Sequence, residues 1–266
     1  MFSFDDRHLR SLWERYAASF RTATPFPHVV LDDFLPEAVV DGVLSEFPRP
    51  GGTGWATYDN DNERKLGVED ETRFGARTRQ LLHQFNGSAF LTCLEGLTGI
   101  EGLIPDPHFR GGGLHQIVRG GFLKVHADFN WYERLKLDRR LNLILYLNKD
   151  WKDEYGGHLE LWNRQMSACE RRILPLFNRC VIFATTDHSY HGHPDPLTCP
   201  DGWTRKSLAL YYYSNGRPDE ERSDAHSTLF KARPGEPSGA RSKAILRKLM
   251  PPIVLDLIRA VRHRQT

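Results

Sequence analysis

The chain has 266 residues, of which 39% are hydrophobic and 26% charged. This is ordinary usage for a globular protein and excludes a disordered or fibrous composition. The 36 basic and 34 acidic residues nearly cancel, so the overall charge gives no reason to expect nucleic acid as a partner. No run of about 18 apolar residues occurs in the sequence, which argues against a membrane-spanning helix.

Cysteine usage and the first residues bear on the compartment. The cysteines are far apart and form no CxxC pair, and the opening MFSFDDRHLR lacks the apolar core of a secretion signal. We therefore expect a reducing environment and a cytoplasmic location. The cysteines are Cys93, Cys169, Cys180 and Cys199.

The first third of the chain has the apolar spacing of several helices. Apolar residues recur every three or four positions over residues 9–20, the period of one helix face. A short β-branched strand at 28–34 precedes a helix opened by Pro36, since proline suits the first helical turn. Two more helices are predicted over 76–85 and 88–99.

Residues 48–65 are rich in turn formers and charge and lack periodicity, which predicts a loop. The part around Trp55 and Tyr58, together with the segment 130–137, is a candidate cover for a binding site. Packing is the alternative role for its aromatic side chains.

From about residue 114 the pattern changes to short strands separated by turn signals such as EYGG and LFNR. That density of strands is typical of a sandwich, jelly roll or barrel. The strand candidates are LHQIV, FLKVH, LNLILYL, HLELW, RILPL, RCVIFAT and SLALYYY. We predict an α/β region at 1–113, a β core at 114–215, and a linker with a basic helical tail at 216–266.

One pair of residues in the β core is suited to binding a metal ion. His126 and Asp128 end the strand candidate in FLKVHADFNW, two positions apart and therefore on the same side of an extended chain. An imidazole and a carboxylate, completed by a distant histidine, form the set of ligands that holds iron(II) and leaves one side of the metal open. An HxD pair alone is common by chance, so a metal site is inferred only if other features of the β core also indicate one.

Further along, TTDHSYHGHPDPL places histidines after a strand, and TRKSLALYYYS begins the next strand with an arginine. In order and spacing, LKVHAD, RRLNLILYLNKDW, GGHLELW, PLFNRCVIFAT, SYHGHP and RKSLALYYY resemble the prolyl 4-hydroxylase branch of the 2-oxoglutarate and iron(II)-dependent oxygenases. The resemblance implies an α+β fold with a mainly β core. That core is a double-stranded β-helix, a cupin-like jelly roll, with an N-terminal helical layer and basic C-terminal helices.

Carried onto this sequence, the resemblance assigns iron(II) to His126, Asp128 and His191. His191 is preferred because its intervals from the strand VIFAT and to Arg205 match the family pattern. Three other histidines remain alternatives for the distal ligand. They are His193, which otherwise hydrogen-bonds close to the metal, His188 and His158.

The resemblance also assigns residues to 2-oxoglutarate. The guanidinium of Arg205 suits the planar distal carboxylate, because it offers two parallel hydrogen bonds. A solvated strand residue is the alternative interpretation of this arginine. Further expected contacts with the co-substrate are Ser207, on the same face as Arg205, Tyr146, whose alternative role is a core aromatic, and Gln116, one strand earlier.

The implied reaction hydroxylates a prolyl, amino-acid or other small-molecule or peptidyl substrate. It consumes 2-oxoglutarate and oxygen and releases succinate and carbon dioxide, with ascorbate as a supporting reductant. Two other classes remain alternatives: a catalytically silent metal-binding module that recognises a partner, and a cupin-like metal isomerase or hydrolase. For the basic tail, a solvated helical appendage is preferred over contact with an acidic partner or an anionic membrane surface.

Overall fold

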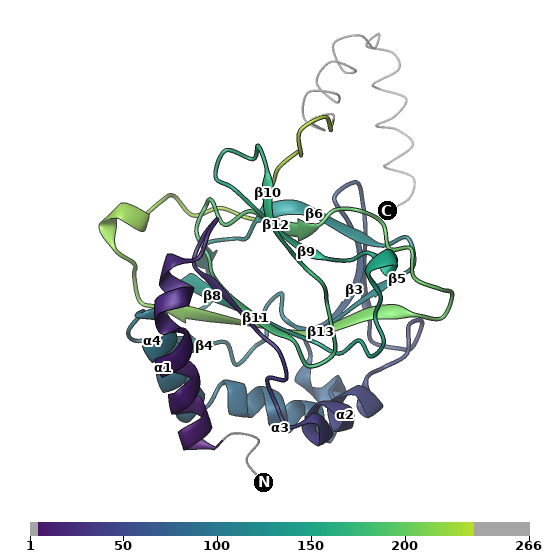
Figure 1. Ribbon diagram of the computed structural model, residues 1–266, viewed down its shortest axis with the longest axis horizontal. Helices are drawn as coiled ribbons and strands as arrows, with labels where there is room; N and C mark the ends of the chain where they lie inside the picture. The colour runs from purple at the N-terminus through teal and green to yellow at the C-terminus, as the bar shows by residue number, and fades with distance from the viewer. Residues whose placement is uncertain (1–4, 237–266) are drawn as a thin grey trace.

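The computed structural model describes residues 5–236, so the predicted basic helices of the tail lie outside the described residues. Four helices lie on one side of a large curled antiparallel sheet (Figure 1). The helices are α1 (Asp6–Thr22), α2 (Glu37–Glu46), α3 (Ala76–Phe85) and α4 (Ser88–Thr98), with short 3-10 turns at Glu71–Arg73, Asp153–Tyr155 and Asp219–Glu221.

The sheet has the strand order β1-β11-β8-β13-β5-β3-β6-β12-β9-β10, and β2, β4, β7 and β14 pair at its sides. It curls into the open barrel of a jelly roll, as the sequence predicted. The strands are β1 (His28–Leu31), β2 (Ala56–Asp59), β3 (Glu63–Val68), β4 (Ile104–Pro105), β5 (Gly113–Val118), β6 (Phe122–Ala127), β7 (Trp131–Tyr132), β8 (Leu137–Tyr146), β9 (Leu159–Trp162), β10 (Cys169–Ile173), β11 (Cys180–Ala184), β12 (His191–His193), β13 (Thr204–Ser214) and β14 (Leu229–Phe230).

The four predicted helices and the first strand are confirmed. The prediction of a loop over 48–65 is wrong in part, because β2 and the start of β3 lie within it. β3 pairs with both β5 and β6 and so belongs to the main sheet. The sequence ERKLGV does not alternate cleanly between polar and apolar residues, so the period-two signal of a half-buried strand was missing.

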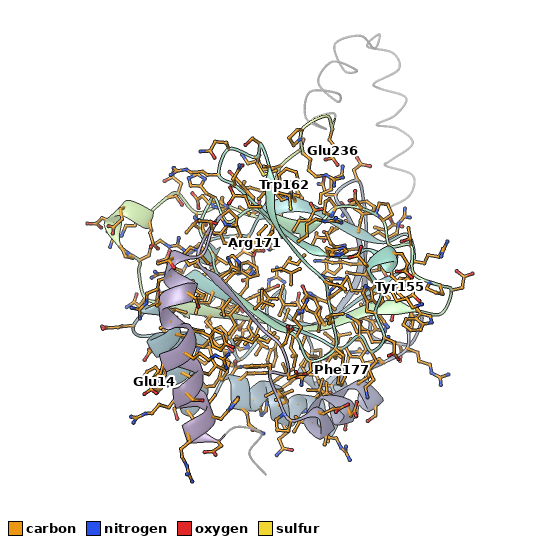
Figure 2. All side chains as sticks on the ribbon, in the orientation of Figure 1. Glu14, Tyr155, Trp162, Arg171, Phe177 and Glu236 are labelled. Carbon is orange, nitrogen blue, oxygen red and sulfur yellow. The ribbon has the colours of Figure 1, made fainter. Side chains whose placement is uncertain are left out.

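Alternation along β8 and β13 gives the sheet two different faces. Leu143 and Leu208 pack in the large core that the sheet shares with the helices. Side chains fill the layer between the helices and the sheet (Figure 2). The intervening residues, such as Asn142 and Ser207, face the inside of the barrel and line a cavity there. One face therefore stabilises the fold, and the other is free to carry polar side chains.

Helix α1 crosses α4 at a very short distance. A Cβ atom built on Gly96 would lie 1.1 Å from Cε3 of Trp13, so only glycine allows this approach. Phe90 and Leu94 of α4 and Phe20 of α1 are fully buried in the same core. Among residues 5–236, no helix is long and apolar enough to span a lipid bilayer.

We expect Gly96→Ala to lower the free energy of unfolding by about 2 kcal/mol, because an overpacked contact outweighs the gain in helix propensity. Urea denaturation of the metal-free protein measures this. The double variant Gly96→Ala/Trp13→Leu should recover at least half of the loss, since the smaller side chain makes room for the new methyl group. Full stability of the single variant would contradict the close crossing.

Candidate metal centre

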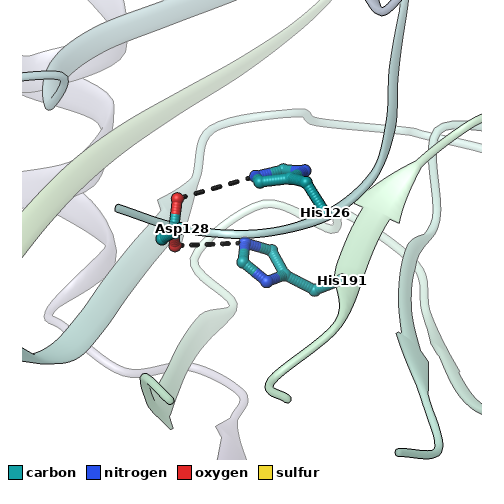
Figure 3. A group of neighbouring side chains, drawn as sticks. All are labelled: His126, Asp128 and His191. Atoms are coloured by element: carbon teal, nitrogen blue, oxygen red, sulfur yellow. Dashed lines mark ion pairs between the residues drawn. The ribbon is translucent and has the colours of Figure 1, made fainter. Parts of the chain in front are cut away.

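His126, Asp128 and His191 meet at one end of the barrel. The first two come from the end of β6 and the residues after it, and His191 opens the neighbouring strand β12, where it pairs directly with His126. One ligand atom from each of the three residues lies within 4.8 Å of the others. The two carboxylate oxygens of Asp128 face one imidazole each, at 3.6 Å from Nε2 of His126 and 3.5 Å from Nε2 of His191 (Figure 3).

The backbone fixes the orientation of both imidazoles. Nδ1 of His126 lies 2.8 Å from the carbonyl of Lys124, and Nδ1 of His191 lies 2.8 Å from that of Ser189. A carbonyl only accepts hydrogen bonds, so Nδ1 carries the proton and Nε2 keeps its lone pair for a metal. Burial, followed by the neighbouring His126, lowers the pKa of His191 to about 4, so this ligand is neutral at pH 7.

Asp128 is held by two donors that no sequence motif predicted. Oδ2 accepts a hydrogen bond of 2.7 Å from the amide of Asn142 and lies 3.0 Å from the guanidinium of Arg139. Arg139 in turn donates to Oδ1 of Asn142 at 3.0 and 2.7 Å. Both partners come from β8, whose sequence is LDRRLNLILY, and an arginine and an asparagine beside an apolar run were the available signal.

The charge of Arg139 is deeply buried. Its side chain is 1% exposed, and its guanidinium lies over the rings of Tyr211 and Phe129, at 3.5 and 4.5 Å from their centroids. Burial by itself raises the pKa of Asp128, but Arg139 and then the two imidazoles outweigh it and hold that pKa well below its usual range. The carboxylate is therefore ionised and ready to bind a cation.

These residues line a cavity of about 1050 Å³ inside the barrel. Tyr58 and the aromatic pair Trp131 and Tyr132 contribute to its wall, as expected for cover segments. Trp55 does not, because its ring packs against Phe47. Ile144 and Leu159 add apolar surface to the interior.

Arg205 lies in the same cavity and is 5% exposed. Its Nε donates to the carbonyl of Gly157 at 2.8 Å, and its Nη2 donates to the hydroxyl of Tyr146 at 3.2 Å. Gly157 has a positive φ of 73°, and a Cβ there would lie 2.9 Å from Cδ of the arginine. Ser207 lines the cavity two residues along the same strand.

Two of the expected co-substrate contacts differ from the prediction. Tyr146 packs in the apolar cluster with Phe183 and meets Arg205 through its hydroxyl rather than lining the cavity. The expectation that Gln116 faces the co-substrate is wrong, because its amide donates to the hydroxyl of Thr204 on the opposite face of β5. The residues of β5 that reach the cavity are its neighbours, including His115.

The rival histidines lie apart from the metal cluster. His158 is 2.9 Å from the carboxylate of Asp153, outside the cavity. His188 packs against the ring of Tyr190. His193 does line the cavity, but it is not part of the cluster, which is the only one with metal-ligand spacing within residues 5–236.

A segment near the end of the described chain, within the stretch predicted to be a linker, forms another wall of the cavity. Its residues 225–228 and Phe230 line the cavity, and the ring of Phe230 lies 5.5 Å from that of His126. We call residues 223–230 the strap. The amide of Asn130 donates to the hydroxyl of Ser223 at 2.9 Å, and its carbonyl oxygen accepts from the backbone of His226 at 2.9 Å.

The described geometry defines a class of protein. Two imidazoles and one carboxylate in the cavity of a jelly roll, which a buried arginine also lines, fit a mononuclear metal centre that keeps one side open. Orientation of each Nε2 by a backbone carbonyl is what such a site requires.

Comparison with known proteins identifies the class more narrowly. Residues 112–213 match the model of the 2OG-Fe(II) oxygenase superfamily. A prolyl-4-hydroxylase from Pseudomonas putida has the same fold, with a TM-score of 0.53 and 17% identity over 74% of this chain and 98% of that one. A Trichoplax adhaerens prolyl hydroxylase, whose structure includes a hypoxia inducible factor peptide fragment, has a TM-score of 0.55 and 16% identity over 78% of this chain and 91% of that one. A prolyl 4-hydroxylase from Phytophthora capsici has a TM-score of 0.54 and 15% identity over 85% of this chain and 72% of that one.

Residues 112–213, which include His126, Asp128, His191 and Arg205, are thus similar to the 2-oxoglutarate and iron(II)-dependent oxygenase superfamily. This match, the jelly-roll core and the cluster of His126, Asp128 and His191 together support a dioxygenase with iron(II) and 2-oxoglutarate as its cofactors.

We expect Arg139→Met to lower the free energy of unfolding of the metal-free protein by about 3 kcal/mol at pH 7, because it leaves a buried carboxylate without its counter-charge. In the parent protein the depressed pKa of Asp128 contributes stability above the unfolded pKa, and this is lost as the pH falls through the folded pKa. In the variant, burial without Arg139 shifts the pKa of this carboxyl upward, so it takes up a proton at a higher pH than in the parent. The difference between variant and parent should therefore shrink as the pH is lowered towards 4.

Urea denaturation at several pH values, with a chelator present, measures this difference. Lys149→Met is the matched control, since Lys149 pairs with Asp41 at the surface and such pairs contribute at most about 1 kcal/mol. A loss for Arg139→Met that is equally small, or that does not change with pH, would show that the buried pair does not stabilise the fold.

Proposed function

We propose that this protein hydroxylates an aliphatic carbon of a small-molecule or peptidyl substrate, with iron held by His126, Asp128 and His191 and with the distal carboxylate of 2-oxoglutarate bound by Arg205. The observation that carries the proposal is the juxtaposition of the three ligands with a buried arginine in one cavity. A dicarboxylate that chelates the metal at one end and pairs with an arginine at the other requires such groups in the same cavity.

The residues have separate tasks in this proposal. His126 and His191 donate neutral nitrogens, and Asp128 supplies the negative charge. Iron(II), when bound, supplies the activation of oxygen and of the 2-oxo acid. Arg205 orients the co-substrate, so that its 2-oxo end reaches the ligands rather than lying free in the cavity.

Apolar groups on the cavity wall limit the access of water. Ile144 and Leu159 are two of these groups, and Phe230 of the strap packs against the ring of His126. Exclusion of water protects a reactive site from side reactions. The strap and Trp131 are therefore proposed to form the part of the wall that a substrate contacts.

The class of substrate is proposed from the size and lining of the cavity. Its mouth combines aromatic side chains, such as Tyr58 and Tyr132, with charged ones, such as Arg110 and Glu69. A peptide bound to the Trichoplax adhaerens enzyme is consistent with a peptidyl substrate here. A prolyl or amino-acid side chain is small enough for the interior.

We also propose a cytoplasmic location, because the four cysteines are free.

We expect anaerobic addition of 2-oxoglutarate to the iron(II)-loaded protein to produce a weak visible charge-transfer band. His126→Ala and His191→Ala should abolish the band because each removes a ligand. Arg205→Leu should keep the band but raise the Kd of 2-oxoglutarate about 10- to 100-fold, since charged hydrogen bonds contribute about 1.5–3 kcal/mol. Absorbance titration measures all four proteins.

Arg164→Ala is the matched control for loss of an arginine, because that exposed side chain lies outside the cavity. Its Kd should equal that of the parent. An unchanged band in His191→Ala would show that another histidine is the distal metal ligand. Activity with zinc in the absence of oxygen and 2-oxoglutarate would contradict the oxygenase reaction altogether.

Hydroxylation itself is tested with labelled oxygen. Turnover under ¹⁸O₂ should place one labelled atom in succinate and the other in the product, detected by mass spectrometry across a panel of prolyl peptides and free amino acids. A substrate that is desaturated or rearranged without gaining labelled oxygen would contradict hydroxylation while leaving the metal and co-substrate sites intact.

A further inference from the structure

His193 is a buried cavity side chain that the proposed metal site does not use. It is 3% exposed, and neither Nδ1 nor Nε2 has a hydrogen-bond partner among residues 5–236. Leaving such a group unpartnered costs about 1–3 kcal/mol. Buried polar atoms are nearly always hydrogen-bonded, so this ring is suited to a bound molecule.

The other histidines of the cavity are already engaged. His126 and His191 each donate Nδ1 to a backbone carbonyl. The ring of His115 lies 3.1 Å from the carbonyl of Gly111. His226 of the strap pairs with a carboxylate at 2.9 Å. Full burial without any partner therefore distinguishes His193 from every other histidine in the cavity wall.

The surroundings of His193 indicate what it binds. Arg205 and Lys65 line the same cavity as His193. Burial lowers the pKa of His193 well below its usual range, and the positive charges of Arg205 and then Lys65 lower it further, so the ring is neutral. Lys65 already pairs with Glu63 at 3.1 Å. Arg205 forms no ion pair within the described part of the chain, since its partners are a carbonyl and a hydroxyl.

A buried arginine without a counter-charge and a buried imidazole without a partner thus line the same cavity. A single anion with several acceptor oxygens satisfies both, because the guanidinium and one imidazole N–H are donors. A carboxylate fits this combination, and an apolar substrate group does not.

We propose that His193 donates a hydrogen bond to the distal carboxylate of the co-substrate dicarboxylate and so selects it over 2-oxo acids that lack this group. The inference rests on the proposed function of the same cavity. His193 is a specificity residue in this proposal, and it does not coordinate the metal.

The test compares two ligands of the anaerobic iron(II)-loaded protein by calorimetric and absorbance titration. 2-Oxoglutarate has the distal carboxylate, and 2-oxopentanoate has a methyl group there. We expect His193→Leu to weaken 2-oxoglutarate about tenfold, as loss of one charged hydrogen bond predicts. The Kd of 2-oxopentanoate should stay within twofold, and His193→Gln, which keeps an N–H donor, should restore part of the loss.

A second readout separates binding from a structural role. In the metal-free protein, His193→Leu should not lower the unfolding midpoint, because it replaces an unpartnered polar group with an apolar one. The rise in thermal midpoint on adding iron(II) and 2-oxoglutarate should be smaller than in the parent. A variant that is already destabilised without ligand would show that the ring has a structural role and would overturn the proposal.

His115→Leu is the matched control, since this cavity histidine has a backbone partner, and its ratio of the two Kd values should stay within twofold of the parent. Equal weakening of both ligands in His193→Leu would place the contact at the chelating end and overturn the proposal. Unchanged binding of both would overturn it as well. If the parent protein binds neither ligand, the proposed function itself has failed, which the parent titration shows before any variant is made.

Discussion

The metal site depends on one electrostatic constraint, the fixing of Asp128 by Arg139 and Asn142. A carboxylate at the mouth of a barrel would otherwise be free to rotate or to take up a proton on burial. Two donors on Oδ2, at 2.7 and 3.0 Å, hold its plane and keep it charged. The cation that does this is itself buried between two aromatic rings, so its position is set by packing as well as by charge.

This arrangement links the fold to the chemistry through a single strand. β8 packs Leu141, Leu143 and Leu145 against the helices. From the other face it presents Asn142, and near its start Arg139, to the metal ligands. A shift of register by one residue would exchange the two sets of side chains. The helical layer, by fixing the apolar face of β8, therefore also fixes the position of Asp128.

The neighbouring strand β13 divides its side chains between the core and the cavity in the same way. β13 sends Leu208 and Leu210 to the core and Arg205 and Ser207 to the cavity. The cavity thus has a metal end at β6 and β12 and a cationic end at β13. The strap closes part of the wall beside the metal end, where β14 pairs with His126 through Phe230. Sequence separation between these parts is large, and only the curled sheet brings them together.

The sequence by itself determined the elements with a clear period and the metal pair within one strand. The helix face of 9–20, the strand density after residue 114 and the same-side placement of His126 and Asp128 follow from local geometry, which needs no partner segment. Tertiary structure decided the rest. Pairing of β12 with β6 selected His191 as the neighbour of His126, and face alternation on β5 turned Gln116 away from the cavity. The roles of Arg139, His193 and the strap depend on contacts between distant strands, and the spacing of residues along one strand carries no information about such contacts.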